Sequence, residues 1–255
     1  MGDINLSQDR IGTTKVNNKN EVMMVVEYVN THDITVEFQD EYKARVHTSW
    51  GMFERGVVKN PYRPMVFGAG IIGNKYKSRI RNKLTIEYRT WQNMLQRCFS
   101  QKYKNSHPAY QDVTCCNEWL LFENFYEWMH SQENFDKWAS IGGGAIDKDI
   151  LIKGNRIYSP DACCLVPQQI NSLFIKRKDY RGDCPIGVSK LKKYYVVDCH
   201  GDYVGLHSTL EDAFLAYKEY KEKIIKQIAQ REYDKGNITK ECYEAMLKYE
   251  VEITD

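Results

Sequence analysis

The chain has 255 residues, which is enough for one large domain or two to three small ones. Its composition, 42% hydrophobic and 27% charged, is that of a soluble globular protein, and its formal net charge is +2. No apolar run approaches the roughly 18 residues of a membrane-spanning helix, and the opening stretch MGDINLSQDR contains no apolar signal core, so we expect neither a membrane protein nor a secreted one. We therefore expect a cytoplasmic protein that does not contact a membrane.

Residues 1–65 are expected to form a small β module. The runs EVMMVVEYV (21–29) and ITVEFQ (34–39) alternate and are rich in β-branched residues, and the intervening NTHD favours a turn. The segment 42–58 could add two more strands, and such short strands close most readily into a small barrel or curled sheet. Two interpretations stay open: a docking or nucleic-acid module, and a folding platform.

A strongly basic segment follows. Residues 59–104 contain eleven basic side chains and one acid, Glu87, so the local charge is 11 − 1 = +10. Its first part, up to about residue 83, contains glycines and prolines and is expected to be an extended arm. Such density favours contact with the phosphate backbone of DNA, although a solvated basic surface is the alternative. The expected DNA contacts of this region are Arg79, Arg81, Lys83, Arg89 and Arg97.

Two helices are predicted next. The first begins near Thr85 and places an apolar stripe at helical spacing, which favours a core face. The second is expected in 115–131, where aromatic residues from Trp119 to Trp128 would pack into the core. His107 and His130 flank this helix, and each is more typical of a surface or core histidine than of a catalyst.

The stretch AIDKDILIKGNRIYSPDACCLVPQQIN (145–171) predicts a strand, a polar loop, a second strand and then a helix from Gln168 that continues to about Gly182. A hairpin packed against a helix can bring Asp147 and Asn171 within reach of one metal ion. A carboxylate and an amide oxygen are hard ligands suited to Mg²⁺, which stabilises the leaving oxygen of a phosphodiester. The alternative is a polar hairpin without a ligand.

This stretch resembles the ββα-metal core of HNH nucleases, in the divergent form of phage-encoded homing endonucleases. That family has a strand of the type Leu-Asp-(His/Arg)-x-Asp, then Gly-Asn, then Tyr-Ser-Pro-x-Asn-Cys, then a helix with Asn. The chain has, in this order, Ile146-Asp147-Lys148-Asp149, Gly154-Asn155, Tyr158-Ser159-Pro160-Asp161-Ala162-Cys163 and Asn171. The stretches YRTWQNMLQRCFS (88–100) and VTCCNEWLLFENFYEWM (113–129) resemble upstream blocks of the same family, so the resemblance covers about 88–176.

The resemblance implies that Asp147 and Asn171 hold Mg²⁺ or another divalent metal and that the protein cleaves DNA. The family's general-base histidine directly follows the aspartate, and Lys148 occupies that position here. A protonated lysine cannot accept a proton from water, although it can contact a phosphate. The candidate catalytic residues are Asp147, Lys148 and Asn171, and Lys153 in the same loop is an expected DNA contact.

Residues 181–255 predict three short strands, a long helix capped by Thr209 and ending near Gly236, and a last short helix. Residues 181–220 resemble the AP2 DNA-binding domain, a three-stranded sheet backed by a helix. The matching residues are Gly187-Val188, Tyr194-Tyr195, Val204-Gly205-Leu206-His207-Ser208-Thr209, Asp212-Ala213 and Ala216-Tyr217. The resemblance implies a sheet that lies in the major groove, with Lys190, Lys192, Lys193 and Tyr195 as DNA contacts. An ordinary α+β module is the alternative.

The eight cysteines include two adjacent pairs, Cys115-Cys116 and Cys163-Cys164, and neither pair has the C-x-x-C spacing of zinc ligands. We expect free, mostly buried thiols and no zinc site, with a composite zinc site as the alternative.

Together these patterns predict an α+β protein in three parts: a small N-terminal β module (1–65), a basic arm with a central divergent ββα-metal core and helices (66–180), and a C-terminal three-stranded sheet with helices (181–255). The two resemblances predict a phage or prophage protein of HNH homing-endonuclease type in the bacterial host cytoplasm. It would bind double-stranded DNA and cleave it with Mg²⁺. The alternatives are a catalytically inactive DNA-binding protein and a phage protein that binds a host protein.

Overall fold

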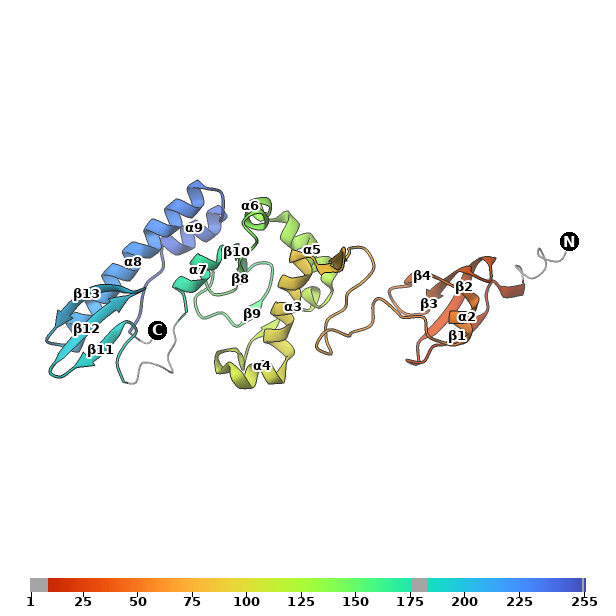
Figure 1. Ribbon diagram of the computed structural model, residues 1–255, viewed down its shortest axis with the longest axis horizontal. Helices are drawn as coiled ribbons and strands as arrows, with labels where there is room; N and C mark the ends of the chain where they lie inside the picture. The colour runs from red at the N-terminus through yellow and green to blue at the C-terminus, as the bar shows by residue number, and fades with distance from the viewer. Residues whose placement is uncertain (1–8, 176–182, 254) are drawn as a thin grey trace. The chain divides into compact units, whose positions relative to one another are not determined.

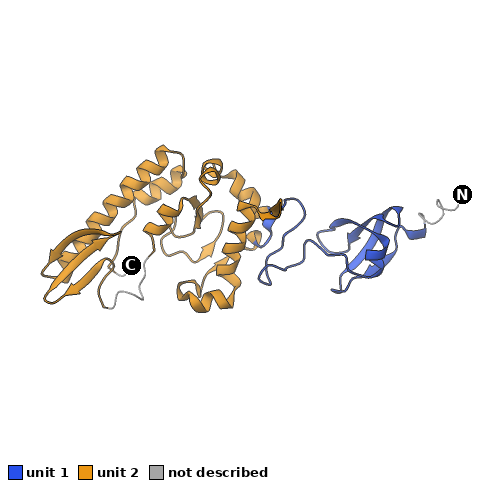
Figure 2. Cartoon of the chain, in the orientation of Figure 1, with its two compact units in different colours: residues 1–78, 120–123 blue, residues 79–119, 124–255 orange. Residues whose placement is uncertain are grey.

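A computed structural model describes residues 9–175, 183–253 and 255, and confirms the predicted α+β class (Figure 1). The chain divides into two compact units, residues 1–78 with 120–123, and residues 79–119 with 124–255 (Figure 2). In the described ranges, no helix is long and apolar enough to cross a lipid bilayer.

The first unit contains an antiparallel four-stranded sheet in sequential order. Alternate side chains of its two central strands are buried and pack on Phe53 and Val58. Only one of the two strands expected in 42–58 forms. The second is replaced by a short helix, because the Ser49 hydroxyl accepts from the backbone N–H of Met52 and starts a helix there. The elements are β1 (Thr14–Val16), β2 (Val22–Asn30), β3 (Asp33–Phe38), β4 (Arg45–Thr48) and α2 (Trp50–Glu54).

The basic segment is not a free extended arm. Glu123 Oε1 accepts from the backbone N–H groups of Asn74 and Lys75 at 2.8 and 2.7 Å, and thereby fixes this part of the segment. The segment then ends in a hairpin of β5 (Arg79–Ile80) and β6 (Lys83–Leu84). The two turn residues, Arg81 and Asn82, have φ values of 47° and 63°, as a tight two-residue hairpin turn requires.

Helices and short strands build the central part of the second unit. The first helix begins directly after Thr85, close to its predicted start, and the Thr85 side chain caps it. Trp91, Met94, Leu95 and Cys98 are buried on one face of it. The second helix begins at Phe122 rather than near Cys115, because Cys115 pairs in a short parallel strand with Tyr158. The elements are α3 (Ile86–Phe99), α4 (Gln101–Ser106), η1 (Pro108–Tyr110), β7 (Thr114–Cys115), η2 (Asn117–Leu120), α5 (Phe122–Ser131), α6 (Phe135–Ser140) and β9 (Ile157–Tyr158).

The predicted strand–loop–strand–helix order is present in the structure. Strand β8 (Ala145–Asp147) pairs antiparallel with β10 (Cys164–Val166), with Asp147 opposite Cys164, and α7 (Gln168–Leu173) follows. Helix α7 ends earlier than expected, and the remainder of its predicted extent, 176–182, lies outside the described residues.

The C-terminal elements also follow the predicted order. Three antiparallel strands pack one face against a long helix, which the Thr209 hydroxyl caps by accepting from the N–H of Asp212. Gly236 follows this helix with φ +71°. The elements are β11 (Val188–Leu191), β12 (Tyr194–Cys199), β13 (Asp202–His207), α8 (Leu210–Asp234) and α9 (Lys240–Leu247).

The second unit has a core to which the β8–β10 hairpin and the C-terminal helices both contribute. Val166 and Ile170 are buried in it together with Ile225 of α8 and Met246 of α9. The predicted domain boundary at 180–181 lies outside the described residues, so it stays a prediction.

Candidate functional site

Asp147 is the last residue of β8 and only 8% of its surface is exposed. Its Oδ1 accepts from the backbone N–H of Asp149 at 2.7 Å and of Ile150 at 3.0 Å. Within the described residues, no hydrogen bond to the second oxygen, Oδ2, is formed. Burial raises the pKa of Asp147, and the two N–H groups oppose this effect only in part. A bound divalent cation would offset the cost of the buried charge.

Lys148, which directly follows Asp147, is held inside the loop. Its ammonium donates to Asp149 Oδ2 and to the backbone oxygen of Asn155, both at 2.7 Å. Asn155 completes the arrangement by donating from Nδ2 to the backbone oxygens of Lys148 and Ile157. An ammonium that donates in this way has no lone pair to accept a proton from water. Lys148 therefore stabilises the loop that follows Asp147.

Asn171 lies in α7, the helix that packs on β8, and its side chain is half-exposed. No hydrogen bond joins it to Asp147. Among the described residues, no three His, Cys, Asp or Glu side chains gather as a metal site. A metal held here would therefore depend on Asp147, on the Asn171 amide and on oxygens from water or phosphate, which is a donor set that suits Mg²⁺.

Two tyrosines to which the sequence patterns gave no role at the site lie near it: Tyr110, and Tyr158 of the Tyr-Ser-Pro block. Arg97 Nη1 donates to the hydroxyl of Tyr158 at 3.1 Å, and the guanidinium carbon lies 5.6 Å from the centre of the Tyr110 ring. Burial is the main cause that raises the pKa of Tyr110, and the nearby charges of Asp147 and Asp149 raise it further while Arg97 lowers it. The hydroxyl of Tyr110 thus lies within electrostatic range of both Arg97 and Asp147.

His107 is not placed as a base for this site. Its ring stacks on that of Tyr103, with the centres 4.0 Å apart, and its Nδ1 lies 3.0 Å from Ser106 Oγ. These contacts hold the exposed imidazole on its own helix turn.

The predicted DNA contacts lie in different surroundings. Arg79, Arg81 and Lys83 are exposed on the β5–β6 hairpin. Lys153 is instead paired, because its ammonium lies 3.3 Å from a carboxylate oxygen of Glu252 and 3.3 Å from one of Asp255. Its charge is therefore largely neutralised within the protein.

The C-terminal sheet presents an apolar outer face. Tyr195 lies on the helix side and packs against the core, and Lys190 is directly opposite it in β11. Lys192 and Lys193 form the turn between β11 and β12. Tyr194, rather than Tyr195, is on the outer face, where the exposed large side chains are Leu191, Tyr194, Tyr203 and Leu206.

The eight cysteines are free, and five of them are buried. The neighbouring thiol of Cys98, together with burial, raises the pKa of Cys115, and the neighbouring thiol of Cys242, together with burial, raises that of Cys164. Burial raises the pKa of Cys116 to about 11. Such thiols are neutral packing groups.

Comparisons with known proteins add no family to this description. No family model, no curated protein and no solved structure matches the chain.

Proposed function

We propose that the chain is a DNA-binding protein of HNH homing-endonuclease type, encoded by a phage or prophage and acting in the cytoplasm of the bacterial host. The observation that carries the proposal is Asp147, a nearly buried carboxylate at the end of the first strand of a strand–loop–strand–helix unit. Burying an ionised carboxylate costs desolvation free energy, which a bound divalent cation would offset. Such buried carboxylates are often found at functional sites.

In this proposal Asp147 and Asn171 hold Mg²⁺ over a phosphate of double-stranded DNA. The metal, when bound, supplies stabilisation of the leaving oxygen. The backbone N–H groups of Asp149 and Ile150 orient the Asp147 carboxylate, and Lys148 holds the following loop in place by its hydrogen bond to the backbone oxygen of Asn155. The exposed cations of the β5–β6 hairpin would contact the flanking backbone.

Asp147→Asn is the sharpest test, because the amide oxygen can still accept from both backbone N–H groups. Plasmid DNA is incubated with wild-type protein and variant in Mg²⁺, and nicking is followed on gels while binding is followed by gel shift. The proposal expects nicking by the wild type and loss of nicking in the variant, which still binds DNA. Unchanged nicking by the variant would contradict it.

Catalytically inactive DNA binding is the second candidate, and the engagement of Lys148 in the loop favours it, because no base stands directly after Asp147. It predicts salt-sensitive gel shifts without nicking in any divalent metal. If the protein does not bind DNA even at low salt, both proposals fail. A host-protein partner on the apolar face of the C-terminal sheet then becomes the better explanation.

A further inference from the structure

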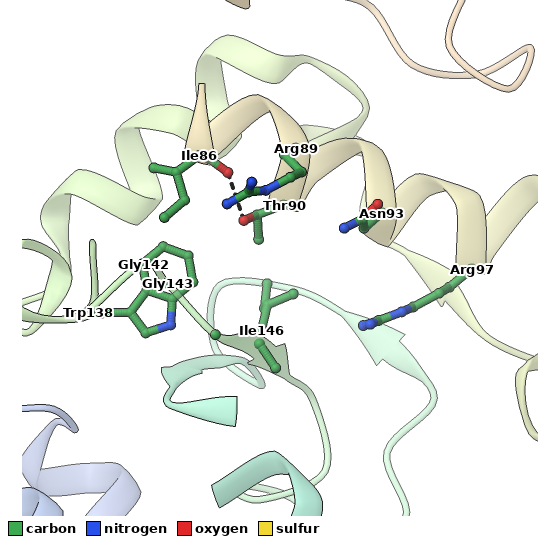
Figure 3. Close-up of a pocket in the computed structure, with 11 residues that line it drawn as sticks. Ile86, Arg89, Thr90, Asn93, Arg97, Trp138, Gly142, Gly143 and Ile146 are labelled. Carbon is green, nitrogen blue, oxygen red and sulfur yellow. Dashed lines mark hydrogen bonds between the residues drawn. The ribbon is translucent and has the colours of Figure 1, made fainter. Parts of the chain in front are cut away.

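A small open pocket, about 60 Å³ in volume, lies between α3 and the glycine turn that leads into β8. Arg89, Asn93 and Arg97 are spaced four residues apart, so they form one stripe along the helix, and Figure 3 shows this stripe opposite Ile146. Ile146 directly precedes Asp147 in the chain. The pocket therefore lies one residue along β8 from Asp147.

The polar groups of the pocket are suited to an anion. Its lining includes two guanidinium groups, an amide and a hydroxyl, and no carboxylate. Over the ranges that the structure describes, neither Arg89 nor Arg97 forms a salt bridge. Arg97 is half-buried, and its described polar contact is one hydrogen bond to the Tyr158 hydroxyl. A partly desolvated cation without a counterion is costly, and an anionic ligand would offset that cost.

The opposite wall of the pocket is backbone that only glycine allows. Gly142 and Gly143 have φ values of +85° and +79°, and a Cβ on Gly143 would lie 2.6 Å from Ile86 Cδ1. A Cβ on Gly144 would lie 2.2 Å from the backbone oxygen of Val166. The turn thus packs closely against its neighbours, so a larger residue at Gly143 or Gly144 would displace this wall of the pocket.

We infer that this pocket binds a phosphodiester group of a DNA strand, next to the phosphate that lies over Asp147. Arg89 and Arg97 hold its oxygens, and Asn93 between them donates a further hydrogen bond. The inference rests on the proposed function, because the DNA strand must pass Asp147, and it adds a defined anion subsite to it. Arg97, fixed by Tyr158 and by the Tyr110 ring, is the oriented member of the pair.

The test uses the full chain with Arg89→Ala, which removes an exposed side chain, and Arg97→Lys, which keeps the charge but loses the planar fork. Lys226→Ala on the exposed surface of α8 is the control for loss of one positive charge. Affinity for a duplex is measured over a salt series. The inference expects Arg89→Ala to lower the salt slope by about one ion and weaken binding by roughly tenfold, and Arg97→Lys to weaken it similarly, while Lys226→Ala matches the wild type.

Inorganic phosphate provides an independent measurement. Its effect on the thermal midpoint is compared in the wild type and in Arg89→Ala, and the inference expects stabilisation of the wild type alone. If duplex binding is strong but both arginine variants behave as Lys226→Ala does, the subsite is wrong while the proposed function stands. If the wild type does not bind duplex, the proposed function fails, and the phosphate measurement alone then decides whether the pocket is an anion site.

Discussion

At the scale of single residues, Asp147 and Lys148 show what a sequence motif can and cannot predict. The resemblance to HNH nucleases pointed to Asp147, and the structure places it buried at the end of a strand. The hydrogen bonds of Lys148 could not be predicted from the sequence. They depend on the path of the loop, which brings the backbone oxygen of Asn155 next to the Lys148 ammonium. The roles of Tyr110 and Tyr158 were also missed, because both depend on contacts with Arg97 of α3, which is distant from Tyr158 in sequence.

The raised pKa of Asp147 has a consequence for stability. A carboxyl whose pKa is higher in the folded state than its unfolded value of 3.8 contributes stability that is fully present below that pH and is lost as the pH rises through the folded pKa. At neutral pH the ionised group therefore destabilises the fold. We expect Asp147→Asn to raise the thermal midpoint at pH 7, with a gain that shrinks in acid, and Mg²⁺ to stabilise only the wild type. A lower midpoint for the variant at pH 7 would show that the charge stabilises the fold.

Lys221 of α8 gives a pH dependence of the opposite kind. The residue is 5% exposed, its ammonium contacts the ring Nε2 of His200, and Cys199 lies nearby. Burial lowers the pKa of Lys221 from 10.5, so the corresponding stability is present above pH 10.5 and is lost as the pH falls through the folded value. We expect the free energy of unfolding of the wild type to rise relative to that of Lys221→Met as the pH is raised from 7 toward 10. Urea titrations at several pH values measure this difference, and a constant difference would refute the assignment.

At the scale of elements, local signals predicted most of the helices and strands, because caps and alternation act over a few residues. Thr85 and Thr209 start α3 and α8 as expected. The predicted secondary structure is wrong where pairing between distant segments determines the conformation. Cys115, for example, was expected in a helix but lies in a strand that pairs with β9. Which face of a strand is buried depends on register, and a shift of one residue reverses it. This is why Tyr195, which is partly buried, could not be distinguished by sequence from its exposed neighbour Tyr194.

The two neighbouring tyrosines therefore make a matched pair of substitutions. Tyr195 packs on the core of the C-terminal sheet and Tyr194 lies on its outer face. Tyr195→Ala should lower the free energy of unfolding by about 2 kcal/mol or more, while Tyr194→Ala should change it by no more than about 0.5 kcal/mol. If the sheet contacts DNA through its outer face, Tyr194→Ala alone weakens binding. Equal loss of stability in both variants would contradict the register of β12.

At the scale of the whole molecule, the second unit joins segments that the sequence analysis assigned to separate parts. Asn134 donates to the backbone oxygens of Leu165 in β10 and of Asn237, which follows α8, at 2.9 and 2.8 Å. The same region buries apolar side chains from β10, α7, α8 and α9 in one cluster. The sequence could not predict this, because an apolar helix stripe shows that a helix is covered but not which element covers it.

The shared core predicts that the C-terminal helices and the β8–β10 hairpin unfold together. Met246 of α9 is fully buried in that core, and truncation of a buried methionine to alanine costs about 2 to 5 kcal/mol. Met246→Ala should therefore lower hydrogen-exchange protection in β8 and β10 as well as in α9. Met65→Ala, at a methionine that is 55% exposed, is the control and should leave the protection of these elements unchanged. Loss of protection confined to α9 would show that the helix unfolds alone, and the β8–β10 hairpin would then not depend on the C-terminal helices for its stability.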